Sequence, residues 1–146
     1  MVDYWTQETM IPLSVMIQSF LKNILMNSTF NQDAGAERVR LITINNNRSR
    51  GIHSLDLSRS TDRLPVLLQT KILEIIFGSE RLAISWSSIM TDRSFWTEGD
   101  IAVKYAVGQP MRIRTSFDML ALTHHVIVKS AALLLGLKDD HYVMGQ

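Results

Sequence analysis

The stretch from Gly51 to Gln69, GIHSLDLSRSTDRLPVLLQ, constrains the fold most, because its pattern changes from strand to turn to helix within a few residues. It predicts a strand over Gly51–Leu57, a turn over Ser58–Thr61 and a helix that begins near Asp62–Pro65, where proline loses no helical hydrogen bond. Asp56 would then stand at the carboxyl end of a strand, which is where open α/β sheets bind ligands. Asp56 and Asp62 together suit a divalent cation and a ligand with hydroxyl groups. Simpler roles stay open, since Asp62 could cap the helix and Asp56 could be a turn residue.

Length and charge limit the classes of protein to which this chain can belong. Its 146 residues suffice for one domain with a sizeable core, and a hydrophobic content of 46% is typical of a globular chain. Lys and Arg number 15 against 14 acidic residues, which argues against a dedicated, charge-driven nucleic-acid binder but leaves room for a basic groove. Cysteine is absent, so disulfides, thiolate metal sites and cysteine nucleophiles are excluded.

No membrane span or targeting segment is expected. Polar residues interrupt both Ile11–Met26 and Met119–Leu137, so neither run reaches the roughly 18 apolar residues of a span. The first residues, MVDYWTQET, carry two acids and no arginine, unlike a signal or transit peptide. A protein working inside an organelle would then be made there or be imported without an obvious N-terminal address.

Helical and strand patterns alternate along the chain. Helices are expected over residues 6–27, 34–44 (weaker), 64–77, from Ser79–Glu80 up to a loop over Thr91–Gly99, and 115–135; strands are expected over Ile101–Ala106 and His141–Met144. The first helix would bury Leu13, Met16, Ile17, Phe20, Leu21, Ile24 and Leu25 and expose Ser14, Gln18, Lys22 and Asn23, and the third would bury Leu64, Leu67, Leu68, Ile72, Ile75 and Ile76. The pattern predicts one helix-rich domain of the α/β (α+β) class, and a fragment of a larger domain is the competing interpretation.

The stretch Lys104–Ser130, KYAVGQPMRIRTSFDMLALTHHVIVKS, is the second informative one. It predicts a flexible Gly-Gln-Pro turn between a strand and a long helix, whose first hydroxyl side chains and free N–H groups suit a polyanion or a ribose. His124 and His125 are adjacent and would point about 100° apart on a helix, so they cannot easily share one metal. At least one is expected to be a hydrogen-bonded core or subdomain-interface histidine. No GxSxG, HExxH, Walker A or GxGxxG motif is present.

Five blocks occur in an order that resembles one known family. They are DYWTQ (Asp3–Gln7), TFNQ (Thr29–Gln32), DLSRSTDRLP (Asp56–Pro65), YAVGQPM (Tyr105–Met111) and MLALTHH (Met119–His125). Together they resemble the RNA-dependent RNA polymerases of mitoviruses, naked RNA elements that replicate in mitochondria. Copies of such genes also occur in plant mitochondrial genomes, so the resemblance implies a virus-derived sequence and a mitochondrial location.

The resemblance implies a role for each matching residue. Asp56 would be the metal-binding carboxylate of polymerase motif A, and Asp62 would recognise the ribose of the incoming nucleotide. Gly108, Gln109 and Ser116 would belong to motif B, which holds the template and the nascent base pair. The family uses Mg²⁺ or Mn²⁺, as two ions about 4 Å apart held by carboxylates from neighbouring strands.

The chain also departs from the family pattern. The Gly-Asp-Asp of motif C is expected just after Tyr142–Gly145, where the sequence reads Gln146 and stops, and the basic residues that bind the triphosphate would precede Asp3. Arg112 stands where the family has glycine, and Phe117 and Asp118 replace what is usually a Trp followed by a small residue or proline. Asp139 and Asp140 are interpreted as solvated turn residues. Without the two aspartates of motif C, Asp56 alone should not hold two metal ions.

Three hypotheses follow from this pattern. The leading one is a relic of the fingers and palm, a single partial domain over residues 1–146 with an incomplete central sheet, no functional cofactor and no catalytic activity alone. The second is a non-catalytic module that binds RNA weakly through Arg48, Arg50, Arg112 and Arg114. The third is one part of a split polymerase, whose partner polypeptide supplies motif C. Because the sheet would be incomplete, marginal stability or aggregation is also expected.

Overall fold

The computed structural model of the chain describes residues 3–45, 53–137 and 143. In chain order the elements are α1 (Tyr4–Thr9), α2 (Ile11–Lys22), α3 (Gln32–Asn45), α4 (Ser60–Arg63), α5 (Val66–Phe77), α6 (Glu80–Thr91), β1 (Phe95–Trp96), β2 (Ala102–Val103) and α7 (Arg114–Leu134). The described part is thus helix-rich with a small two-stranded sheet, which confirms the α+β class in its coarse form.

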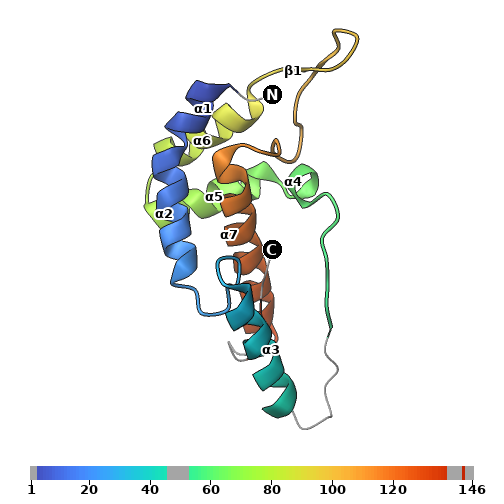
Figure 1. Cartoon of the computed structure of the whole chain (residues 1–146). Helices are drawn as coiled ribbons and strands as arrows, with labels where there is room; N and C mark the ends of the chain where they lie inside the picture. Colours follow the sequence, from blue (N-terminus) through green and yellow to red (C-terminus); the bar gives the residue numbers. More distant parts are fainter. Residues whose placement is uncertain (1–2, 46–52, 138–142, 144–146) are drawn as a thin grey trace.

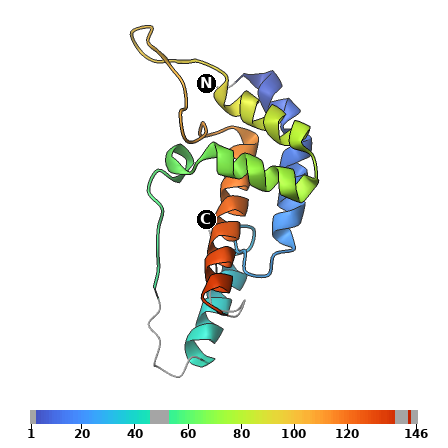
Figure 2. The ribbon, with the colours of Figure 1, turned by 180° about the vertical axis from the view of Figure 1, so that it is seen from behind.

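The long helix α7 lies at the centre of the molecule. Figures 1 and 2 show α2 running along one side of α7, while α5 crosses its N-terminal half and α6 packs against α5. The β1–β2 hairpin projects from one end, and α3 lies at the opposite end. The packing of α2, α4 and α5 on one helix means that the position of α7 sets the geometry of the whole core.

The core is one continuous apolar cluster built around α7 and its neighbours. Its members are Met10, Ile17, Leu21, Val66, Ile72, Leu73, Ala83, Trp86, Met90, Ile113, Met119, Ala121 and Leu122. Trp86 of α6 is buried, and its indole Nε1 donates a hydrogen bond of 2.9 Å to Thr115 Oγ1 at the start of α7. The buried indole therefore has its polar atom satisfied while its ring fills the core.

The single helix expected over residues 6–27 is two helices, α1 and α2, and α2 ends at Lys22. Its buried face was predicted only in part, since Ile17 and Leu21 are buried as expected. Ser14 is buried because its hydroxyl bonds to Asp118 of α7, whereas Met16, Phe20 and Leu25 are exposed. Because a buried hydroxyl can satisfy a buried carboxyl, an apolar pattern alone cannot locate this face.

The buried face of α5 is rotated from the expected one for a similar reason. Leu67 and Ile75 are exposed, whereas Val66, Gln69, Ile72 and Leu73 are buried. Gln69 can be buried because its side-chain amide bonds to Leu64 O and to Gln109. Leu64, which precedes Pro65, is extended and separates α4 from α5, so α5 begins just after the predicted start near Asp62–Pro65.

The strand predictions were largely wrong. Within the described part of Gly51–Leu57, residues 53–57 form an exposed extended segment and not a strand. The strand predicted over Ile101–Ala106 shrinks to β2, which pairs antiparallel with β1 inside the predicted loop. A turn with positive φ at Gly99 and Asp100 makes this pairing possible. The strand predicted over His141–Met144 lies outside the described residues, apart from Val143, which is not in a strand.

Helix α7 is long and apolar enough, by length and composition, to cross a membrane, contrary to the expectation from its polar residues. Most of its residues from Thr115 to Thr123 are nevertheless buried inside the protein. A core helix meets the same length and composition criteria. In this structure the first half of α7 is such a core helix.

Candidate functional site

The turn that contains Gly108 packs directly on α4, so two of the predicted blocks lie together. The backbone N–H of Gln109 donates to Thr61 O (2.9 Å), and the N–H of Val66 donates to Val107 O (2.8 Å). A Cβ atom on Gly108 would collide with the carbonyl groups of Thr61 and Asp62. Glycine is therefore required here for close backbone approach.

Gln109 ties this turn to the beginning of α7. Its side chain is fully buried, and its Nε2 donates to Gln69 Oε1 (2.9 Å) and to Ser116 O (2.9 Å). Ser116 itself is 3% exposed. The structure thus brings Gly108, Gln109 and Ser116 together. Through these two hydrogen bonds, Gln109 connects α5 to α7.

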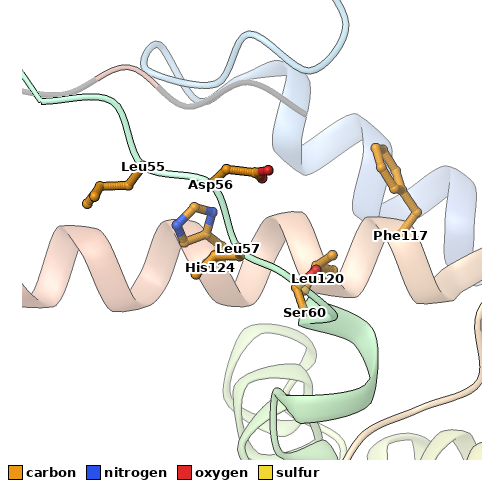
Figure 3. A pocket seen from close by; sticks show the side chains of 7 residues that line it. All are labelled: Leu55, Asp56, Leu57, Ser60, Phe117, Leu120 and His124. Carbon is orange, nitrogen blue, oxygen red and sulfur yellow. The ribbon is translucent and has the colours of Figure 1, made fainter.

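Asp56 reaches α7 from the extended segment that precedes α4. It lines a cavity of about 220 Å³ together with Leu55, Leu57, Ser60, Phe117, Leu120 and His124 (Figure 3). His124 comes from α7, so the cavity joins a carboxylate and an imidazole from two distant parts of the sequence. Asp56 is exposed and does not stand at the end of a strand, in contrast to the prediction.

Asp62 lies on α4 and does not line the cavity with Asp56. Its charge acts on Tyr105, because burial and then the negative charge of Asp62 raise the pKa of the Tyr105 phenol. Tyr105 also contacts Phe95 of β1 edge-on, with ring centroids 5.5 Å apart. Asp62 therefore faces the segment that leads into the Gly108 turn.

The described residues do not fit a two-metal site. Among residues 3–45, 53–137 and 143, no three His, Asp or Glu side chains lie close enough to hold one metal ion. Asp56 is the one carboxylate that lines the cavity, whereas Mg²⁺ requires near-octahedral oxygen coordination and two-metal sites require several carboxylates. Asp56 can supply one ligand only.

A second hollow of about 410 Å³ lies at the start of α7. Thr61, Met111, Arg112, Ile113, Arg114, Ser116 and Phe117 line it. Phe117 lines both hollows, and no ion pair is found for Arg112 or Arg114 among the described residues. The hollow therefore combines apolar walls with two exposed guanidinium groups. Arg48 and Arg50, which were predicted to bind RNA together with Arg112 and Arg114, lie outside the described residues.

Sequence patterns did not reveal the role of Phe117 or of Gln7. Phe117 was noted only as a departure from the family, yet it lines both hollows. The side-chain amide of Gln7 hydrogen-bonds to the turn before α7 through both its nitrogen and its oxygen. It lies 105 residues from Arg112, so no local pattern connects them.

Asp118 forms the polar contact between α2 and α7. Ser14 Oγ donates to its Oδ2 (2.5 Å) and Gln18 Nε2 donates to its Oδ1 (3.1 Å), while the Asp118 side chain is buried. Burial raises the pKa of the Asp118 carboxyl; the hydrogen bonds from Ser14 and Gln18 and the charge of Arg114 oppose this rise. The effect of desolvation on the pKa of Asp118 is therefore larger than the combined effect of the three contacts that stabilise the charged carboxylate.

This raised pKa predicts a pH-dependent contribution to stability. Because folded Asp118 keeps its proton to higher pH than in the unfolded chain, its contribution is fully present below the unfolded pKa and is lost as pH rises through the folded pKa. Urea unfolding across the acidic range should show that wild type loses stability over this window relative to Asp118→Asn, which does not titrate. Parallel pH profiles for the two proteins would contradict the assignment.

Comparison with known proteins gives consistent results. The family described as "Mitovirus RNA-dependent RNA polymerase" matches residues 1–144. The chain is 39% identical over 144 residues to the RNA-directed RNA polymerase of Cryphonectria parasitica mitovirus 1, covering 97% of this chain and 17% of that protein. It is 32% identical over 123 residues to an uncharacterized mitochondrial protein of Arabidopsis thaliana, covering 79% and 45% respectively. No solved structure matches the chain.

Proposed function

The chain belongs to the mitovirus RNA-dependent RNA polymerase family, and we propose that it is a partial fingers and palm domain without catalytic activity of its own. It spans 17% of the length of the viral relative and 45% of the Arabidopsis one. The observation that carries the proposal is the composition of the cavity at α7. Among the described residues that line this cavity, Asp56 is the one carboxylate. A mitochondrial location is part of the proposal, supported by the family and by the mitochondrial relative.

Family resemblance gives each site residue a place in nucleotide transfer. Asp56 would correspond to one of the carboxylates that hold Mg²⁺ or Mn²⁺ in a complete polymerase, but the described residues around it do not form such a site. Asp62 would orient the ribose, and Gly108, Gln109 and Ser116 would shape the surface that holds the template. The close contact of the Gly108 turn with α4 supports a shared role for these residues.

Template-directed incorporation of nucleotides by the purified chain tests this proposal, and we expect none with Mg²⁺ or Mn²⁺. In a split polymerase, a second polypeptide would supply further carboxylates beside Asp56. Co-purification of such a partner, with incorporation restored on mixing, would favour the split enzyme over the relic.

A non-catalytic RNA-binding module is the second candidate, and the hollow at the start of α7 favours it. Its two exposed arginines suit phosphate groups, and Phe117 and Met111 offer apolar surface on which a base could stack. This chemistry is not sequence-specific. Single-stranded RNA is the expected ligand, and the affinity should depend on salt because phosphate contacts release counterions.

Fluorescence anisotropy with a ten-nucleotide RNA should therefore show binding at low salt that weakens as salt rises. The double variant Arg112→Gly/Arg114→Gln should reduce the slope of log K against log salt by about 0.7 for each lost phosphate contact. Arg40→Gln is the matched control, because Arg40 lies on α3 and pairs with Glu37. The absence of binding at low salt, or an equal slope in all three proteins, would rule out this candidate.

A further inference from the structure

The side chain of Gln7 bridges the turn that precedes α7. Its Nε2 donates to the carbonyl oxygen of Arg112 (2.8 Å), and its Oε1 accepts from the backbone N–H of Arg114 (2.9 Å). These two groups flank Ile113, which is 2% exposed and belongs to the core. One amide from α1 thus fixes both sides of a residue that anchors the turn.

Arg112 needs such support because its backbone is strained. Its φ of 65° lies in the left-handed region, which residues with a side chain rarely adopt. Such a conformation persists where surrounding contacts hold it in place. The hydrogen bond from Gln7 to the Arg112 carbonyl is a contact of that kind.

The same amide also caps α7. Ile113 is the N-cap residue and makes no side-chain hydrogen bond to the helix, so the first N–H groups of α7 need another acceptor. Gln7 Oε1 accepts from the Arg114 N–H, the first of these groups. Helix α7 is thus capped from a different helix at the far end of the sequence.

Helix α1 is held in place by polar contacts, since it buries none of its side chains. Asp3 caps α1 by accepting from Thr6 N (2.8 Å), and Arg93 pairs with Asp3 Oδ2 (3.3 Å) and donates to Thr6 Oγ1 (3.1 Å). These contacts connect α1 to the segment after α6. The position of Gln7 therefore does not depend on the turn that it bridges.

We propose that Gln7 is a positioning residue that holds Arg112 in its left-handed conformation and caps α7. By doing so it fixes the guanidinium groups of Arg112 and Arg114 at the hollow beside Phe117. This second effect rests on the RNA-binding function proposed above. The backbone effect does not depend on RNA and can be measured without it.

Hydrogen exchange and scalar couplings measured by NMR on the full chain test the backbone effect. In Gln7→Ala, the Arg114 amide should exchange roughly tenfold faster, and the HN–Hα coupling of Arg112 should leave its left-handed value. Gln7→Glu keeps an acceptor for Arg114 but loses the donor to Arg112, so it should preserve Arg114 protection better than Arg112 geometry. Glu8→Gln, on the same helix, is the matched control and should change neither value.

Three outcomes are distinguishable. Unchanged Arg114 exchange and unchanged Arg112 coupling in Gln7→Ala would overturn the inference. If both change and wild type binds RNA, the RNA affinity of Gln7→Ala should fall about threefold at low salt while Glu8→Gln keeps wild-type affinity. If both change but wild type binds no RNA, the RNA-binding proposal fails and the bridge by Gln7 stands. Circular dichroism of each variant confirms that it is folded.

Discussion

Gly108→Ala is expected to lose about 3 kcal/mol or more of the free energy of unfolding, a large share of the stability of a small domain. The added Cβ would overlap the carbonyl oxygen of Thr61 and the carbonyl group of Asp62. These are backbone atoms, which cannot rotate away as a flexible side chain can. Separating the two segments would also stretch the hydrogen bonds of Gln109 and Val66 that join them.

Urea unfolding followed by circular dichroism measures this loss. Gly136→Ala is the matched control, because Gly136 has a φ of 65° but nothing within contact distance of an added Cβ. That control should lose only the conformational cost of a left-handed alanine, about 1 kcal/mol. Equal losses in the two variants would show that Gly108 is not a close-contact position.

The bounds of α6 and α7 were predictable from sequence because their signals are local. Helix α6 begins after Ser79, whose side chain accepts from Leu82 N, and Gly78 takes the left-handed conformation at the end of α5, as its sequence position indicates. Helix α7 begins and ends within one residue of the expected 115–135. Caps and periodicity act within one or two turns, so no tertiary information was needed.

The strands and part of the buried faces were not predictable, because they depend on partners distant in sequence. Residues 53–57 have the composition of a strand, but no strand in the described part of the chain pairs with them. Ser14 was predicted to be exposed, but it is buried because it bonds to Asp118, 104 residues away. The apolar pattern encodes burial of apolar side chains but not of satisfied polar pairs.

In the candidate site too, some features could be predicted from local sequence and others depend on residues distant in sequence. Sequence blocks indicated that Gly108, Gln109 and Ser116 act together, and the structure places them in contact around one turn. The cavity of Asp56 and His124 and the bridge by Gln7 required the fold, because each joins residues that no local spacing relates. Arg112 and Arg114 were named from the sequence, and the fold adds the hollow that they line with Thr61.

The second large effect concerns catalysis. Against an intact polymerase, the isolated chain should show at least a roughly million-fold lower rate of nucleotide incorporation, which is below detection. Two-metal phosphoryl transfer needs several carboxylates around the ions, and Asp56 is the one that lines the α7 cavity in the described part of the chain. With Asp56 as the one carboxylate at the cavity, we expect no activation of the attacking hydroxyl group.

Primer extension on a short RNA template tests this central claim most directly. Purified wild type is assayed beside Asp56→Ala with Mg²⁺ and with Mn²⁺, and an intact mitovirus polymerase serves as the positive control. We expect no incorporation by either form of the chain while the control extends the primer. Incorporation by wild type that is lost in Asp56→Ala would contradict it, and would mean that other residues, such as Asp139 or Asp140, complete a working metal site.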